Sequence, residues 1–210
     1  KPNFENKPAC RLINPSKSEL GKVSKNILEK ANKTILEKCS LNQWKNTNEV
    51  IKWFDNIANK TNKTFICFDV CEFYPSITKD LLMNAIEFAS TYIAISDQDK
   101  DIILHAKESL LYEDKNIWCK NNDTTFDVTM GSYDGAETCE LIGLYILSQM
   151  QDLEINVGLY RDDGLAACSQ SPQQVELIKK KMCKIFADNG LKITIEANKK
   201  CIDFLDITMD

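Results

Sequence analysis

The sequence contains a single histidine, and none of its cysteines is spaced as a CxxC pair. Structural zinc sites are built from closely spaced Cys and His ligands, so this scarcity argues against a zinc site. The chain nevertheless has nine cysteines, an odd number scattered from Cys10 to Cys201. Small buried thiols in a reducing compartment explain them better than a disulfide framework does. His105 is expected to be an ordinary helix-surface or core residue.

Long apolar runs are also missing. No run approaches the length of a membrane span, and the N-terminus begins Lys1-Pro2-Asn3 without an apolar signal segment. We therefore expect an intracellular protein, nuclear or cytoplasmic, with no membrane partner. The abrupt start indicates a domain excised from a longer protein. With 210 residues, 43% of them hydrophobic, the chain is long enough to bury one core, and no repeat or Gly/Ser linker divides it.

The net charge of -5 is unevenly distributed. Residues 1–64 hold 13 Lys and Arg against 6 Asp and Glu, whereas residues 65–210 hold 13 against 25. A basic arm joined to an acidic body suits an enzyme that binds phosphates with one part and metals with the other. A solvated lysine-rich surface explains the same distribution equally well.

The most informative stretch is Tyr160-Arg161-Asp162-Asp163, in which two consecutive acids lie between apolar runs. Adjacent carboxylates repel one another, so such a pair is tolerable in a hairpin turn when a cation, above all a divalent metal, lies against it. A third acid, Asp69, ends the apolar run that starts at Thr64. Two strand-borne acidic sites side by side can bind two Mg²⁺ ions ~4 Å apart, the arrangement used for in-line phosphoryl transfer.

Periodicity and capping signals predict a mixed α+β fold, an antiparallel sheet covered on one face by helices, with both acidic sites on neighbouring strands. The expected elements are a short strand 11–14, helices 22–38 and 49–58, a strand 65–70, helices 79–91 and 97–111, a hairpin of 116–120 with 125–129, a helix 136–149, the acidic hairpin 157–168, a helix 172–189, and strands 191–196 and 202–208.

The motifs resemble those of reverse transcriptases, in the family's order. Asp69-Val70-Cys71-Glu72-Phe73-Tyr74 resembles motif A, and Tyr160-Arg161-Asp162-Asp163 resembles the YxDD of motif C. The other resemblances are Arg11 to the fingers arginine, Met130-Gly131-Ser132 to motif B, Phe186 to Leu191 to motif D, and Phe204-Leu205-Asp206 to the motif E primer grip. The forms of motifs B and E are most similar to those of Penelope-like retroelement polymerases.

This resemblance implies a polymerase palm with a partial fingers subdomain and no thumb. Residues 1–63 would be the basic fingers part and residues 64–210 the palm, with 97–129 as a possible fingers/palm insertion. The implied activity is RNA-directed DNA synthesis by two-metal nucleotidyl transfer from dNTPs to a primer 3′-hydroxyl. The implied partners are an RNA or DNA template with a DNA primer, and the oligomeric state stays open.

The resemblance also assigns roles to residues. Asp69, Asp162 and Asp163 would be the catalytic carboxylates that hold two Mg²⁺ ions, for which Mn²⁺ can substitute, and the backbone carbonyl of Val70 would assist. Tyr74 would exclude the ribose 2′-hydroxyl by a clash, although a packed core aromatic fits the same sequence.

The remaining assignments concern substrate and primer. Arg11 would bind the triphosphate, and Gly131 with Ser132 would lie against the templating base pair. A surface arginine and a plain turn are the simpler alternatives for Arg11 and Gly131. Phe204, Leu205 and Asp206 would grip the primer.

Three departures from the family pattern concern template contact rather than the metal site. Arg161 fills the x of YxDD, where it can pair with a neighbouring acid or touch primer phosphate; Met130 replaces Pro-Gln; and Glu137 and Glu140 put negative charge on the motif B helix. Two rival functions remain. One is a catalytically silent module that binds nucleic acid, and the other is an RNA-dependent RNA polymerase, which Tyr74 disfavours.

Overall fold

The structure is a computed structural model that describes residues 18–109, 111–113, 115–118 and 125–209. Arg11 and the strand expected at 11–14 lie outside the described residues, as do residues 119–124 of the hairpin expected between 116 and 129. None of the described helices combines the length and apolar character that a membrane crossing requires.

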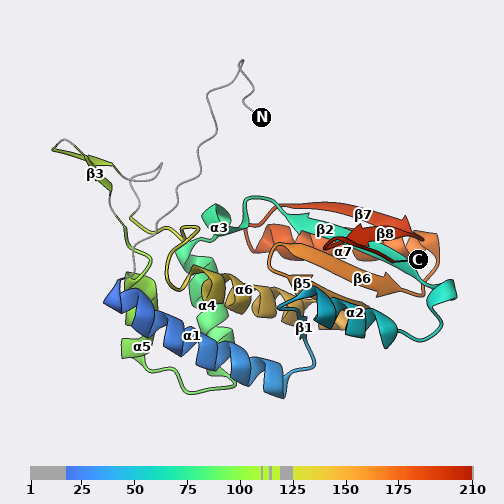
Figure 1. The fold of residues 1–210 in the computed structure, drawn as a ribbon, viewed down its shortest axis with the longest axis horizontal. Coiled ribbons are helices and arrows are strands. Elements are labelled where there is room, and N and C mark those ends of the chain that lie inside the picture. Colours follow the sequence, from blue (N-terminus) through green and yellow to red (C-terminus); the bar gives the residue numbers. More distant parts are fainter. Residues whose placement is uncertain (1–17, 110, 114, 119–124, 210) are drawn as a thin grey trace, which may run out of the picture.

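A five-stranded sheet forms the centre of the fold (Figure 1). Its strands, in spatial order, are β1 (Asn42–Gln43), β5 (Asn156–Tyr160), β6 (Asp163–Cys168), β2 (Thr64–Val70) and β7 (Ile193–Lys199). Neighbours pair antiparallel except β1 and β5, which are parallel. The expected α+β class is therefore confirmed, and the two acid-bearing strands, β2 and β6, are direct neighbours.

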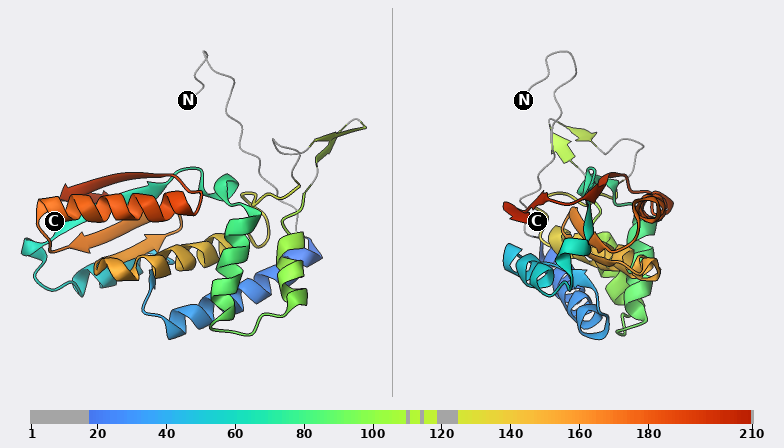
Figure 2. Two further views of the ribbon diagram at one scale, coloured as in Figure 1. Left: turned by 180° about the vertical axis from the view of Figure 1, so that it is seen from behind. Right: turned by 90° about the vertical axis from the view of Figure 1, so that its right-hand side faces the viewer.

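Two helices cover one face of the sheet. They are α6 (Gly135–Gln149) and α7 (Pro172–Asp188), which are seen in front of the strands when the molecule is viewed from behind (Figure 2). Every second residue of the central strands, among them Ile66, Phe68 and Ala166, contributes its apolar side chain to the larger core cluster. This is the helical layer that the sequence predicts.

The opposite face is covered as well. The helix α2 (Thr47–Asp55) and a C-terminal hairpin of β8 (Ile202–Phe204) and β9 (Ile207–Met209) pack there on a second, smaller core cluster. The strand expected over 202–208 is divided because Leu205 and Asp206 both adopt a positive φ, 47° and 64°, as in a two-residue hairpin turn. A single strand was thus the wrong prediction for this segment.

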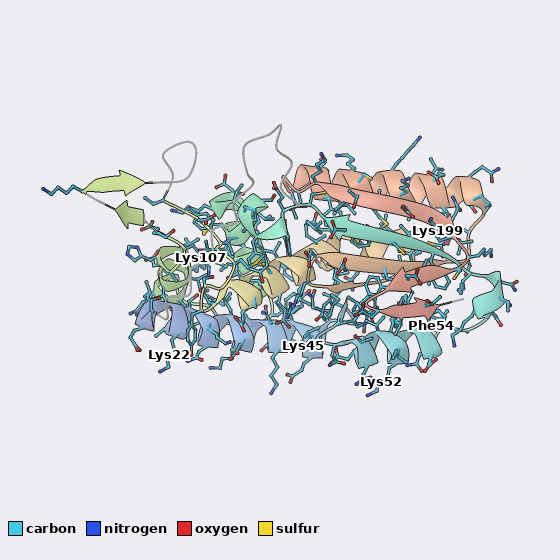
Figure 3. The ribbon with its side chains drawn as sticks, turned by 45° about the horizontal axis from the view of Figure 1, so that its top comes forward. Lys22, Lys45, Lys52, Phe54, Lys107 and Lys199 are labelled. Atoms are coloured by element: carbon cyan, nitrogen blue, oxygen red, sulfur yellow. The ribbon has the colours of Figure 1, made fainter. Side chains whose placement is uncertain are left out.

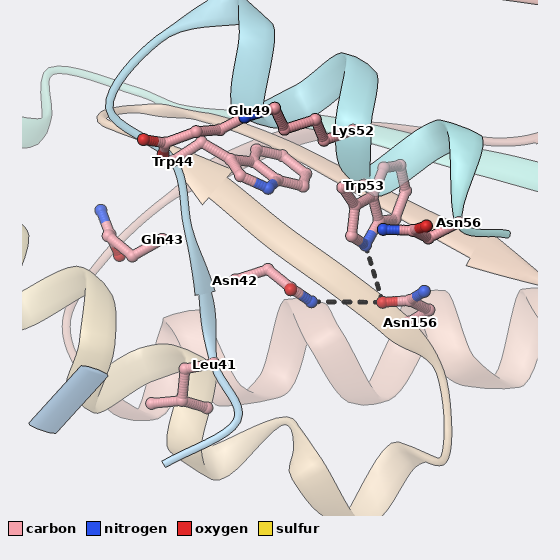
Figure 4. A pocket seen from close by; sticks show the side chains of 9 residues that line it. All are labelled: Leu41, Asn42, Gln43, Trp44, Glu49, Lys52, Trp53, Asn56 and Asn156. Carbon is pink, nitrogen blue, oxygen red and sulfur yellow. Dashed lines mark hydrogen bonds between the residues drawn. The ribbon is translucent and has the colours of Figure 1, made fainter. Parts of the chain in front are cut away.

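The strand β1 was not predicted, because two residues show no periodicity. Asn156 at the start of β5 holds it in place: its Oδ1 accepts hydrogen bonds from Trp53 Nε1 at 2.7 Å and from Asn42 Nδ2 at 3.2 Å (Figure 4). Trp44, which directly follows β1, packs edge-on against Trp53 with ring centroids 5.0 Å apart. These residues line a hollow of about 430 Å³ beside the sheet.

Beyond the end of the sheet lie α1 (Glu19–Lys38) and α4 (Lys79–Ser90), which pack with α6, and α5 (Asp97–His105), which packs with α1 (Figure 1). The helix predicted over 97–111 ends at His105. The predicted pairing of 116–120 with 125–129 is replaced by a hairpin that lies earlier in the sequence. Here β3 (Leu111–Glu113) pairs with β4 (Asn116–Trp118) around Lys115, whose φ is 67°. The remaining short elements are α3 (Phe73–Ser76) and two 3-10 turns, Lys60–Asn62 and Gln151–Leu153.

Candidate active site

Asp69 and Asp163 are directly opposite each other in the β2–β6 pair. Because β5 and β6 are joined by only Arg161 and Asp162, the third acid lies in the turn at the same end of the sheet. The turn is closed by a positive φ of 55° at Arg161 and is tied to β2 by a 2.9 Å hydrogen bond from Val70 N to Asp162 O. The structure thus brings together all three acids that the sequence singles out.

The side chains of Asp69 and Asp163 extend from the face of the sheet that α2 and the β8–β9 hairpin cover. Side chains alternate along a strand, and Phe65 of β2 and Leu165 of β6, which have the same parity as the two acids, belong to the cluster under that hairpin. The acids therefore stand at the open end of a surface that is apolar further along.

The electrostatics of the three carboxylates are unfavourable. Burial, and then the charge of Asp162, raises the pKa of Asp69 above its ordinary value. Burial also raises the pKa of Asp163, followed by the charges of Asp162 and Asp69. In the described part of the chain no Lys, Arg or His forms a salt bridge with any of the three. Among the described residues, this end of the sheet therefore holds negative charge that no ion pair compensates.

Such a donor set suits a hard divalent cation, since Mg²⁺ takes carboxylate oxygens and relieves like-charge repulsion. Within the described ranges, however, no three or more His, Cys, Asp or Glu side chains lie close enough together to form a metal-binding group. The strand register brings the three acids to one end of the sheet, and their role as metal ligands stays a prediction. Val70 is buried beside Asp69, and a role for its carbonyl stays a prediction.

Gly164, immediately after the acid pair, is a site residue that sequence reasoning missed. It is opposite Phe68, and a Cβ added to Gly164 would come within 2.0 Å of the Phe68 ring. The ring is buried and also packs edge-on against Phe186 of α7, with centroids 5.5 Å apart. Glycine is thus needed for the closest approach of the two acid-bearing strands, and its place directly after two acids was the available signal.

Tyr74 lies beside the acidic turn, in the short helix α3. Its ring is half-buried, its hydroxyl lies near the Cys139 thiol of α6, and the charges of Arg161 and Asp162 act on it. Burial is the main cause that raises the pKa of Tyr74 to about 12, and the Cys139 contact adds to it. The contact with Cys139 links positions 65 residues apart and has no signal in the sequence.

Gly131 and Ser132 form the turn that precedes α6. Gly131 has a φ of 88°, which favours glycine, and Ser132 Oγ donates a 2.9 Å hydrogen bond to Thr129 O. A Cβ on Gly135 would lie 2.6 Å from Ser132 Oγ and 3.4 Å from a Tyr74 ring carbon. This turn therefore adjoins Tyr74, and its contact with a template stays a prediction.

Arg161 is exposed, and its guanidinium lies over the Tyr160 ring, 5.4 Å from the ring centroid. It does not form the ion pair with Asp162 or Asp163 that the sequence allowed. Its positive φ and its stacking give it a structural role in the turn.

The predicted primer-grip residues are in the β8–β9 hairpin. Phe204 is buried against Trp44, with ring centroids 5.9 Å apart, whereas Asp206 is exposed. Leu205 and Tyr160 pack on the same cluster. The hairpin therefore adjoins the strand that leads into the acidic turn, on the face from which Asp69 and Asp163 extend.

Comparison with solved structures gives the fold a context. Two structures of apo telomerase from Candida tropicalis superpose on 92% of the chain, with TM-scores of 0.72 and 0.68 at 12% and 14% identity. The RNA-dependent RNA polymerase of a human picobirnavirus covers 74% of the chain, with a TM-score of 0.50 at 14% identity. No family model and no curated protein matches the chain.

These likenesses show the fold alone. The chain has a polymerase palm fold of the type found in telomerase, a reverse transcriptase, and in a viral RNA polymerase. It spans 40–44% of the telomerase chains and 31% of the viral polymerase.

Proposed function

We propose that this chain is the catalytic palm of a reverse transcriptase, which extends a primer 3′-hydroxyl with dNTPs along an RNA or DNA template. The observation that carries the proposal is the pairing of Asp69 with Asp163, with Asp162 tied to Val70, at one end of a polymerase palm sheet. The motif forms noted above favour a Penelope-like enzyme within this class.

Asp69, Asp162 and Asp163 would hold two Mg²⁺ ions, or Mn²⁺ in their place. Bound there, the metals would lower the pKa of the attacking hydroxyl and neutralise charge on the triphosphate. The β2–β6 pairing would keep the spacing of Asp69 and Asp163 constant. The raised pKa values of Asp69 and Asp163 mean that protons compete with metal at acidic pH.

Tyr74 would select the sugar. Its half-buried ring next to Asp162 would occupy the space of a ribose 2′-hydroxyl, so that deoxynucleotides bind and ribonucleotides clash. Gly131 and Ser132, in contact with the same region, would lie under the nascent base pair.

A nucleic-acid partner is supported by charge and by likeness. Residues 1–64 carry the excess of Lys and Arg described above, among them Arg11, which would bind the triphosphate. Telomerase of Candida tropicalis, solved in a complex with a fragment of telomeric RNA, covers 84% of this chain with a TM-score of 0.60. We infer that the chain binds template and primer, with Phe204, Leu205 and Asp206 towards the primer.

The decisive experiment is primer extension on an RNA template with dNTPs and Mg²⁺, comparing the parent chain with Asp162→Asn. We expect the parent to incorporate deoxynucleotides and the variant to lose at least ~10³-fold in rate, since charge stabilisation is most of the chemistry. Asp152→Asn, an exposed acid away from the sheet end, is the matched control and should extend normally. Binding of primer and template without any incorporation would instead identify a silent nucleic-acid-binding module.

A second candidate, RNA-dependent RNA synthesis, is favoured by the likeness to the picobirnavirus polymerase. The same assay with rNTPs alone separates the two. Extension with rNTPs at a rate matching dNTPs would support the RNA polymerase and contradict the role given to Tyr74.

A further inference from the structure

A lysine and an aspartate are buried together beside the start of α6. Lys107, which follows α5 and is labelled in Figure 3, is 2% exposed, and Asp134, the residue before α6, is 1% exposed. Lys107 Nζ forms an ion pair with Asp134 Oδ2, and the fully buried Ser24 of α1 donates its hydroxyl to the same oxygen. Three segments remote in sequence therefore meet at one carboxylate.

Such a pair is costly, because desolvation of two charges is only partly offset by their attraction. Burial lowers the pKa of Lys107, while its contact with Asp134 raises it. Two apolar side chains would hold the same elements together without the cost of desolvating two charges. Stability alone therefore does not explain why a charged pair occupies this position.

The cluster extends from Asp134 to Tyr74. Cys139, five residues after Asp134 on α6, is 4% exposed and is close enough to Lys107 for the ammonium to act on its thiol. The thiol in turn lies near the hydroxyl of Tyr74, whose ring packs against the same core cluster as Cys139. Gly135 lies between Asp134 and Cys139 in the sequence. A Cβ added to it would be 3.4 Å from a carbon of the Tyr74 ring, so the edge of the ring packs against this glycine.

The first turns of α6 therefore place the Cys139 thiol near the hydroxyl of Tyr74 and Gly135 along one edge of its ring. Lys107 and Asp134 hold that part of the helix, since Asp134 O also accepts the hydrogen bonds of Thr138 N, at 3.0 Å, and Thr138 Oγ1, at 2.8 Å. A tyrosine whose hydroxyl lies beside a buried thiol presents its ring, rather than its hydroxyl, to the space beside Asp162.

We propose that Lys107, Asp134 and Cys139 form a positioning cluster that fixes the ring of Tyr74 and thereby sets how strongly the site rejects ribonucleotides. The inference rests on the proposed polymerase function and adds to it specificity-determining residues that do not touch the substrate. Loss of the Cys139 contact frees the ring to rotate, and a mobile ring clashes less with a 2′-hydroxyl.

The test compares Cys139→Ala with Cys168→Ala. Both remove a buried thiol and leave a similar small cavity, but Cys168 lies at the far end of β6, opposite Thr64. We expect Cys139→Ala to lower the dNTP-over-rNTP ratio of kcat/KM about five- to tenfold, the usual worth of one polar contact, and Cys168→Ala to leave the ratio unchanged. An unchanged ratio in Cys139→Ala, or an equal fall in Cys168→Ala, overturns the proposal.

A second readout is independent of catalysis. In protein labelled with ¹³C-tyrosine, the Cζ resonance of Tyr74 is assigned by its absence in Tyr74→Phe and followed at neutral pH. It should shift in Cys139→Ala and stay in place in Cys168→Ala. If the parent extends no primer, the polymerase proposal fails and the sugar-selection part with it, whereas the resonance still decides whether the cluster holds Tyr74.

The buried ion pair is tested by Lys107→Met combined with Asp134→Asn, since Lys107→Met alone leaves a buried carboxylate unpaired and can unfold the chain. The neutral amide keeps an acceptor for Ser24. We expect the double variant to fold, to shift the Tyr74 resonance and to lower the selectivity ratio as Cys139→Ala does. A folded double variant with the parental resonance and ratio would overturn the role of Lys107 and Asp134.

Discussion

Asp69 and Asp163 are opposite each other on adjacent antiparallel strands, so two like charges occupy one of the closest side-chain pairings that a sheet offers. Like charges in such a pair are destabilising, and here a third acid, Asp162, adds to the repulsion. The arrangement weakens the fold and suits cation binding, as expected when a site is built for function rather than stability.

Neutralising one of these acids should therefore stabilise the protein while abolishing extension. We expect Asp69→Asn and Asp163→Asn each to raise Tm, because each removes a repulsive partner and keeps the shape of the side chain. Thermal unfolding followed by circular dichroism measures the change, with Asp152→Asn as the exposed control. A lower Tm in both variants would show that the acids take part in stabilising contacts.

The pH dependence of stability has a definite sign. The raised pKa values of Asp69 and Asp163 mean that the folded state binds these protons more tightly than the unfolded chain does. Their contribution is thus favourable below the ordinary aspartate pKa near 3.8 and is lost as pH rises through the raised values. The double variant Asp69→Asn/Asp163→Asn lacks both titrating groups, so the margin by which its Tm exceeds that of the parent should widen from pH 4 towards neutrality. A constant margin would contradict this assignment.

Divalent metal should stabilise the parent chain. Binding to the folded state alone contributes about 2.7 kcal/mol at a metal concentration a hundredfold above Kd. A titration of Tm with Mg²⁺ and then Mn²⁺ should saturate for the parent and be flat for Asp162→Asn. Asp203→Asn, on the β8–β9 hairpin, is the control that should respond like the parent. An equal response of Asp162→Asn would place the metal elsewhere.

The sugar preference depends on Tyr74. Tyr74→Ala should raise kcat/KM for ribonucleotides relative to deoxynucleotides about 10- to 200-fold, the usual range for one apolar contact in a pocket. Tyr74→Phe keeps the ring and loses only the contact with Cys139, so it should resemble Cys139→Ala. The two changes combined should be no worse than either alone, since both remove the same contact. Unaltered selectivity in Tyr74→Ala would leave Tyr74 as a core aromatic.

The acidic end of the sheet could be predicted from sequence because short-range rules determine it. Two acids between apolar runs imply a hairpin, and an apolar run ending in Asp69 implies a neighbouring strand. Helix ends were predictable for the same reason: Ser171 and Gln174 form the capping box of α7, and Gly190 ends it with a φ of 72°.

Other features depend on contacts between distant residues and left no local pattern. The pairing of Lys107 with Asp134 joins two charged residues that each look solvent-exposed in the sequence. The strand β1 is set by Asn156, more than a hundred residues further along. The division of the C-terminal strand depends on two positive φ angles at Leu205 and Asp206, which are not glycine and so gave no turn signal.

Gly164 provides the last test of the site, because it sets how closely the two acid-bearing strands approach. Gly164→Ala would push a Cβ into the Phe68 ring, and the ring cannot retreat freely since it packs on Phe186. We expect a loss of about 1–3 kcal/mol in the free energy of unfolding, the usual cost of overpacking, together with reduced primer extension because Asp163 is displaced.

The cause can be isolated by a double variant. Phe68→Leu shortens the side chain that meets the new methyl group, so Gly164→Ala/Phe68→Leu should be less destabilised than the sum of the two single changes. Urea unfolding measures the three free energies. Simple additivity would mean that the ring of Phe68 does not cover Gly164, and the close approach of β2 and β6 would then need another explanation.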